Sequence, residues 1–186
     1  MASIISNFFI SLDGVVESPD QWHFDYWSDE MGGVMGRGMA TCTGFLMGRT
    51  LYEEWSAYWA DNTDDDGFGP FIKAIPKYVV STTLTEATWE NTTLVTGSPE
   101  EIEAQLRAIR ADTDGDIGIS GSATLVRSLL AMGLVDTLAL LMHPVVVGSG
   151  QRLFEDTAKT PLTLLSSTTI ANGVLHLEYA PAGGVV

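Results

Sequence analysis

The chain has 186 residues, a length typical of one domain, and 45% of them are hydrophobic, which is enough for a sizeable core. Nine Lys and Arg stand against 24 Asp and Glu, and the resulting net charge of −15 argues against nucleic acid or an anionic membrane as a partner. The single cysteine, Cys42, excludes an intrachain disulfide. No apolar run approaches the roughly 20 residues of a membrane span. The first residues read as a strand rather than a signal peptide, so we expect a cytoplasmic protein.

Residues 3–12 are rich in β-branched and aromatic side chains and predict a strand that ends at the turn pair Asp13-Gly14. Ligands of open α/β sheets gather at the carboxyl ends of strands, which makes Asp13 a candidate catalytic residue. A turn Asp that bonds its own backbone is at least as common.

The apolar spacing from Phe24 to Met35 predicts an amphipathic helix, which is loosened by Gly32, Gly33, Gly36 and Gly38. So many glycines are costly in a helix unless something packs very close to its backbone. Trp22 and Phe24 could wall a site for a flat ligand, or they could belong to the core.

Residues 44–48 predict a short buried strand that runs into Gly48, Arg49 and Thr50 at the start of a helix. A flexible glycine, a guanidinium and a hydroxyl at a helix N-terminus suit a phosphate. The alternative is that Thr50 is a plain N-cap and Arg49 a surface charge. The acidic loop at 61–69 lacks the spacing and final Glu of an EF-hand, so we interpret it as a solvated loop and predict no metal site.

Residues 77–82 predict another buried strand, with Ser81 and Thr82 at its carboxyl end. A brief strand at Leu94-Val95 precedes a helix that begins after Ser98, where Glu101 completes a capping box. We assign this helix no role beyond packing.

The stretch from Asp116 to Phe154 predicts a strand, a turn of small residues, a helix that ends at Gly133, and a second strand from Val135. This is the βαβ unit of a largely parallel sheet. The turn lacks bulk, so its backbone N–H groups could approach a phosphate at the positive end of the helix dipole, or it could merely pack helix against strand. The candidate residues are Gly121, Ser122, Ala123 and Thr124.

Residues 162–170 and 174–179 predict two strands joined by a turn that contains Asn172-Gly173, a strong hairpin signal. The whole pattern predicts a single α/β domain over residues 1–186. Its mixed, mostly parallel sheet is flanked by helices and ends in an antiparallel hairpin.

If the parallel strands are neighbours, the groups at 48–50, 81–83 and 120–124 share one edge of the sheet. Such an edge could hold an extended dinucleotide with its phosphates at helix starts. The G-x-G-x-x-G fingerprint of an ordinary Rossmann domain is absent.

These motifs, in this order, resemble the dihydrofolate reductase-like superfamily, and within it the reductase domain of the bifunctional riboflavin-biosynthesis deaminase/reductase. The matching runs are Ser11–Gly14, Gly48–Glu53, Lys77–Ser81, Gly121–Leu125, Gly133–Asp136 and Pro144–Phe154.

The resemblance implies a three-layer fold, a homodimer and NADPH-dependent hydride transfer to a small pterin- or pyrimidine-like heterocycle. It implies that Gly48, Arg49 and Thr50 grip the cofactor, that Ser81 and Thr82 lie by the adenosine ribose, and that the backbone of 121–124 holds the pyrophosphate. Asp13 would face the substrate near the nicotinamide.

The chain departs from this family at two functional positions. Ser120 precedes Gly121-Ser122 where the riboflavin-pathway reductases usually carry Glu before a Gly-Gly pair, which leaves the substrate open. No cation follows Ser81, which leaves NADH beside NADPH as a cofactor because a 2′-phosphate favours Arg or Lys.

For the proton we hypothesise that Asp13 orients the substrate or relays the proton, with a pKa raised by the nearby apolar Phe24 and Trp22. His23 and His143 are alternatives, although His143 lies in a predicted strand and suits a structural role. The rival to an enzyme is a non-catalytic nucleotide- or ligand-binding dimer of the same fold.

Overall fold

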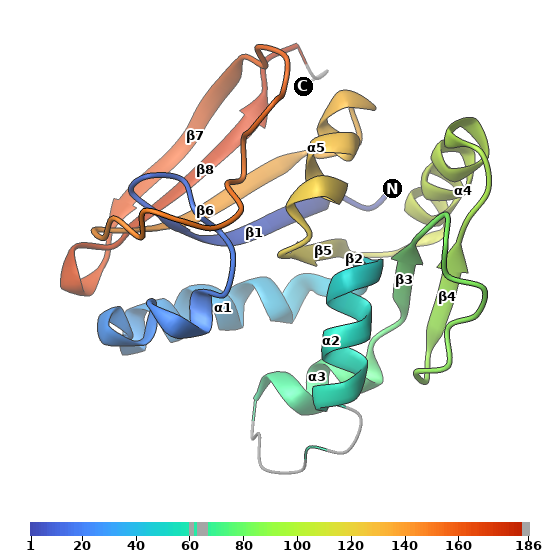
Figure 1. Cartoon of the computed structure of the whole chain (residues 1–186), viewed down its shortest axis with the longest axis horizontal. Helices are drawn as coiled ribbons and strands as arrows, with labels where there is room; N and C mark the ends of the chain where they lie inside the picture. The colour runs from blue at the N-terminus through green and yellow to red at the C-terminus, as the bar shows by residue number, and fades with distance from the viewer. Residues whose placement is uncertain (60–61, 63–66, 184–186) are drawn as a thin grey trace.

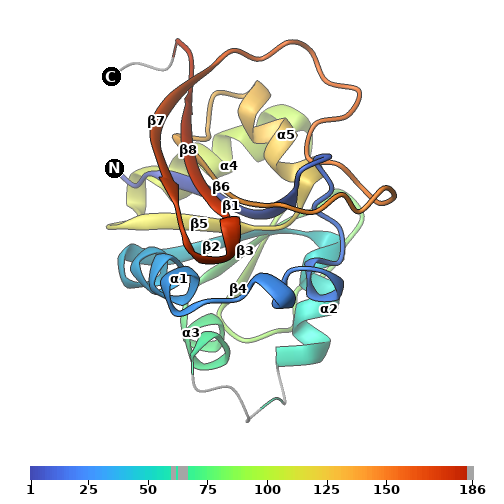
Figure 2. The same cartoon turned by 90° about the vertical axis from the view of Figure 1, so that its left-hand side faces the viewer.

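The computed structural model describes residues 1–59, 62 and 67–183. These residues form three layers, with a central sheet between α4 and α5 on one face and α1, α2 and α3 on the other (Figures 1 and 2). The strands are β1 (Ile4–Ser11), β2 (Cys42–Gly48), β3 (Lys77–Val80), β4 (Thr92–Val95), β5 (Asp116–Ser120), β6 (Thr137–His143), β7 (Leu162–Thr169) and β8 (Leu175–Pro181). The helices are α1 (Asp29–Thr41), α2 (Arg49–Trp59), α3 (Phe68–Ala74), α4 (Pro99–Asp112) and α5 (Ala123–Ala131), with 3-10 turns η1 (Pro19–Gln21), η2 (Phe24–Tyr26) and η3 (Ala171–Gly173).

The strand order in the described chain is β4-β3-β2-β5-β1-β6-β8-β7. Every pair from β4 to β6 is parallel, whereas β8 runs antiparallel to both β6 and β7. The turn between β7 and β8 places Asn172 and Gly173 at positive φ, as the Asn-Gly signal predicts. The predicted mixed sheet with an antiparallel C-terminal hairpin is therefore confirmed.

The predicted β5–α5–β6 unit is also confirmed, although β1 lies between its two strands. Gly133, at φ 65°, ends α5, since the N–H of the next residue, Leu134, returns to the carbonyl of Leu129. The largest core cluster lies under α4 and α5, where Leu106, Val126 and Leu129 are almost fully buried. This packing fixes the position at which α5 begins.

The helix that the apolar spacing places at Phe24 begins later in the structure. Residues Phe24–Tyr26 form the separate turn η2, and α1 starts after Ser28, whose hydroxyl accepts the Met31 N–H at 3.2 Å. The close packing expected of the glycines is wrong at Gly36 and Gly38, where a Cβ would meet no heavy atom within 4 Å. Most of the predicted acidic loop, residues 61 and 63–66, lies outside the described residues.

The strands end at different heights on their carboxyl edge. Strand β5 stops at Ser120, opposite Asn7 of β1, while β1 continues to Ser11, opposite His143 of β6. The Phe8 and Phe9 side chains therefore extend past the end of β5. Among the described helices, none is long and apolar enough to cross a bilayer.

Candidate functional site

A cleft of about 1500 Å³ opens at the carboxyl edge of the parallel strands. All nine residues predicted to bind the cofactor line it, namely Gly48, Arg49, Thr50, Ser81, Thr82, Gly121, Ser122, Ala123 and Thr124. The structure therefore brings together three segments that are separated by more than thirty residues in the chain.

Parallel pairing explains this convergence. Gly48 at the end of β2 lies opposite Val80 at the end of β3, and Leu46 of β2 lies opposite Ile119 of β5. Adjacent strands are about 4.8 Å apart, so three consecutive strand ends span a short, continuous rim. Each segment that follows such an end must start at this rim.

A single hydroxyl ties two parts of the rim together. The Oγ of Ser122 accepts the backbone N–H of Gly48 at 3.0 Å, which fixes the start of α5 against the end of β2. Ser122 lies in the left-handed region at φ 55°, follows Gly121 at φ 67°, and provides no side-chain cap to α5. Among the described residues, the first-turn N–H groups of α5 therefore have no side-chain cap, and they lie in the cleft wall, where an anion is favoured.

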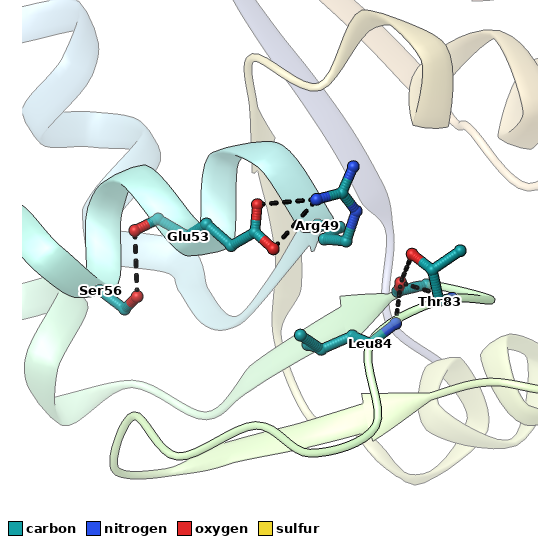
Figure 3. A network of polar contacts seen from close by, with 6 residues as sticks. Arg49, Glu53, Ser56, Thr83 and Leu84 are labelled. Carbon is teal, nitrogen blue, oxygen red and sulfur yellow. Dashed lines mark hydrogen bonds and ion pairs between the residues drawn. The ribbon is translucent and has the colours of Figure 1, made fainter.

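In the turn after β3, the hydroxyl of Ser81 bonds to the backbone of the turn itself. Ser81 is buried, and its hydroxyl accepts the N–H groups of Thr83 at 3.1 Å and Leu84 at 2.9 Å (Figure 3). Ser81 therefore shapes the cleft wall, and Thr82 and Thr83 stand exposed beside it.

The other end of the cleft is aromatic and holds a buried histidine. The His23 ring stacks on Phe9 with centroids 4.4 Å apart and lies 4.1 Å from the ring of Phe24. His23 is 6% exposed, and its Nδ1 has no hydrogen-bond partner among the described residues. Desolvation, followed by the nearby His143, lowers its pKa, so the ring is neutral at neutral pH. A neutral imidazole among flat rings can exchange hydrogen bonds with a planar ligand.

His143 lies deeper, at the end of β6, and is fully buried. Its Nδ1 bonds the Leu141 carbonyl at 2.8 Å, which supports the structural role that we expected. Its Nε2, however, has no partner among the described residues, and desolvation lowers its pKa. The ring centroids of His23 and His143 are 6.1 Å apart.

The two residues predicted to bind the substrate have different positions. Phe24 lines the cleft and is 63% exposed. Trp22 does not appear among the described residues lining the cleft: it packs edge-on against His143 and donates its Nε1–H to the Glu17 carbonyl at 3.1 Å.

Asp13 is held in a set of hydrogen bonds outside the described lining of the cleft. Its carboxylate accepts the Ser11 hydroxyl at 2.7 Å and the N–H groups of Val147 at 3.1 Å and Gly148 at 2.9 Å. The Ser11 bond, followed by the two backbone bonds, lowers the pKa of Asp13 to about 2. The raised pKa that we predicted is wrong, because hydrogen bonds stabilise the ionised form. This geometry favours a structural role in which Asp13 joins the end of β1 to the segment after β6.

A second cavity of about 310 Å³ lies between α1 and the sheet. It shares Phe8, Phe9, Met35, Phe68 and Ser120 with the cleft, so the two spaces adjoin from the aromatic end to the end of β5. Gly38 and Gly118 line it, and a Cβ on Gly118 would lie 2.9 Å from the Cys42 sulfur. Sequence reasoning missed this cavity. Gly38 is the one glycine of α1 among the described residues that line it, and the missing side chain there leaves space.

Sequence reasoning also missed the acidic groups of the cleft, Glu17, Asp20 and Glu54. Arg49 is the one Lys or Arg among the described residues that line it. Across the described chain, no cluster of three His, Cys, Asp or Glu is arranged to hold a metal ion.

The family model of the RibD C-terminal domain matches residues 2–176. The chain belongs to this family. Over 138 residues it is 30% identical to the uncharacterized protein YyaP of Bacillus subtilis (strain 168), a match that covers 72% of this chain and 71% of that protein. Membership of the RibD C-terminal domain family supports a reductase role.

Solved structures share the fold, among them the following two. A pyrimidine reductase-like protein from Corynebacterium diphtheriae superposes with a TM-score of 0.68 at 12% identity, covering 97% of this chain and 92% of that one. Dihydrofolate reductase from Enterococcus faecalis, complexed with NADP(H), superposes with a TM-score of 0.60 at 13% identity, covering 97% and 96%. The predicted dihydrofolate reductase-like fold is thus confirmed.

Proposed function

We propose that this protein is an NAD(P)H-dependent reductase that reduces a small pterin- or pyrimidine-like heterocycle. The observation that carries the proposal is the convergence of all nine predicted cofactor residues on one cleft. The RibD C-terminal domain family adds the reductase class, and the dihydrofolate reductase neighbour bears NADP(H) in its own structure.

The groups that line the cleft are of the kinds that bind a dinucleotide. The uncapped start of α5 offers N–H groups to a pyrophosphate, and the small residues Gly121, Ser122 and Ala123 leave room for it. Arg49 and the threonines after β3 would receive the adenosine end. A bound nicotinamide dinucleotide would supply a hydride, while the protein's residues supply orientation and a dry, shaped surface.

The substrate would occupy the aromatic end of the cleft. Phe9 and Phe24 offer flat apolar faces, and the adjoining cavity under α1 adds space for a ring. His23 lines the same end of the cleft, and its buried Nδ1 has no partner among the described residues, so a substrate that enters between these rings would supply the missing hydrogen bond. His23 replaces Asp13 as our candidate for contacting the substrate, because the Asp13 carboxylate already accepts three hydrogen bonds and is outside the described lining of the cleft.

Asp13 is hydrogen-bonded to the segment after β6 and so is not free to act on a substrate. This favours a second candidate function, a nucleotide-binding dimer without catalysis. Two measurements separate the candidates. NADPH titration, followed by tryptophan fluorescence, tests binding. NADPH oxidation with a panel of dihydropterins, aminopyrimidinones and quinones tests turnover. Binding with turnover supports the reductase, binding alone supports the non-catalytic protein, and no binding at saturating NADPH refutes both.

We keep the homodimer and the cytoplasmic location as parts of this proposal. Strand β7 is an edge of the sheet and exposes Leu164 and Leu165, which are 52% and 55% accessible. A second copy would cover these side chains. Sedimentation of the wild type beside Leu164→Lys tests the dimer, with a shift toward monomer expected for the variant.

A further inference from the structure

The one cation of the described cleft lining is already paired. The Nη1 of Arg49 donates to both carboxylate oxygens of Glu53, at 3.0 and 2.8 Å, one helical turn along α2 (Figure 3). Both side chains are about half exposed, at 46% and 48%. Arg49 lines the cleft, whereas Glu53 is outside its described lining and reaches the cleft through this pair. A ligand group that contacts Arg49 therefore comes close to the Glu53 carboxylate.

Among the described residues, the lining of the cleft adds no second Lys or Arg beside Arg49. Strands β2 and β3 are adjacent, so Arg49 follows a strand end that lies beside the turn at Ser81 and Thr83. This turn contributes hydroxyls alone, and the next residue after Glu53, Glu54, lines the cleft with a second carboxylate. The net charge at this end of the cleft is therefore negative when Arg49, Glu53 and Glu54 are all ionised.

NADPH and NADH differ by one phosphate on the adenosine ribose, which carries close to two negative charges at neutral pH. A site that prefers NADPH must attract this group, usually through an unopposed Arg or Lys. We propose that Glu53 is the residue that sets the preference between the two dinucleotides, because it offsets the charge of Arg49 and lets the protein bind NADH as well as NADPH. This inference rests on the proposed function, since it presupposes that a nicotinamide dinucleotide occupies the cleft.

The size of the effect follows from Coulomb's law. A phosphate that contacts the free side of Arg49 would lie about 7 Å from the Glu53 carboxylate. At a protein surface, where the effective dielectric constant is below that of bulk water, their salt-screened repulsion corresponds to roughly three- to tenfold weaker binding. NADH lacks this phosphate, so its affinity should change less than about twofold when Glu53 is neutralised.

The test is the dissociation constant of NADPH and of NADH for the wild type and for Glu53→Gln, measured by isothermal titration at low and at physiological salt. Glutamine keeps the shape of the side chain and removes its charge. The matched control is Glu103→Gln, because Glu103 forms the same kind of i,i+4 pair with Arg107, at 2.7 Å on α4, and neither is among the described residues that line the cleft.

We expect Glu53→Gln to bind NADPH three- to tenfold more tightly than the wild type, with a larger gain at low salt. Its dissociation constant for NADH should be nearly unchanged. Glu103→Gln should match the wild type. The inference is overturned by equal gains for both dinucleotides, by an unchanged NADPH constant, or by weaker NADPH binding, which would make Glu53 a residue that positions Arg49. If the wild type binds either dinucleotide and Glu53→Gln gives one of these three results, only this inference is refuted, and the proposed function stands. A wild type that binds neither refutes the proposed function, and this inference with it.

Discussion

The tie between Gly48 and Ser122 allows a sharp test of how the cleft is built. Ser122→Ala removes the acceptor of the Gly48 N–H, a bond of 3.0 Å that is worth about 1 kcal/mol net. It keeps a residue with a Cβ at φ 55°, where the left-handed backbone costs about 1 kcal/mol. Ser122→Gly loses the same bond but relieves that backbone cost.

We therefore expect Ser122→Ala to lower the free energy of unfolding by about 1–2 kcal/mol and Ser122→Gly to be roughly 1 kcal/mol more stable than the alanine variant. For a domain of this size each kcal/mol moves the melting temperature by about 2–4 °C. Urea denaturation followed by tryptophan fluorescence measures the difference. Both variants should also bind NADPH more weakly, because neither can hold the start of α5 against β2.

Ser56→Ala serves as the control, because the Ser56 hydroxyl donates to the carbonyl of Glu53 within exposed α2 and should be nearly neutral (Figure 3). An alanine variant at 122 as stable as the wild type, or a glycine variant less stable than the alanine one, would refute the reasoning. Unchanged NADPH affinity in both variants at 122 would remove Ser122 from the organisation of the cleft.

Three further predictions concern other parts of the molecule. Since the pKa of Asp13 falls from 3.8 to about 2 on folding, its ionised form stabilises the protein above pH about 4, and this contribution disappears as the pH falls toward 2. The stability gap between wild type and Asp13→Asn in urea should thus be full at pH 5 and narrow below pH 4; a constant gap would contradict the assignment. Gly36→Ala should raise the free energy of unfolding by about 1 kcal/mol, because an added Cβ meets no heavy atom within 4 Å and alanine favours a helix. Gly133→Ala is equally uncrowded but lies at φ 65°, so it should lower the free energy of unfolding by about 1 kcal/mol. Equal shifts of the melting temperature in the two variants would contradict this. His23→Phe should unfold within about 1 kcal/mol of the wild type while NADPH oxidation with an active substrate is lost; a large stability loss would make His23 structural.

The parts of the fold that follow from local periodicity could be predicted from the sequence. The strand, turn and helix around Gly121 and the Asn172-Gly173 hairpin each carry their own signal within a few residues. The convergence of three strand ends also follows, because parallel strands present their carboxyl ends at one edge. The start of α1 was missed because apolar spacing continues through η2, although Ser28 marks the true N-cap.

The role of Asp13 could not be read from its neighbours. Its main-chain partners, Val147 and Gly148, lie 134 and 135 residues away in the chain, and they reverse the predicted direction of its pKa. The isolation of the His23 nitrogen is likewise a tertiary feature, since it depends on which rings enclose it. The Arg49–Glu53 pair, in contrast, has i,i+4 spacing that sequence alone could have indicated.

The central claim is that a nicotinamide dinucleotide binds along the rim at Arg49, Ser81 and Gly121, with its nicotinamide ring toward His23. A crystal structure of the protein with saturating NADPH tests it most directly. Our account predicts the pyrophosphate at the first-turn N–H groups of α5 and the nicotinamide beside Phe9 and His23. NADPH bound elsewhere, or no NADPH bound at saturation, would contradict it.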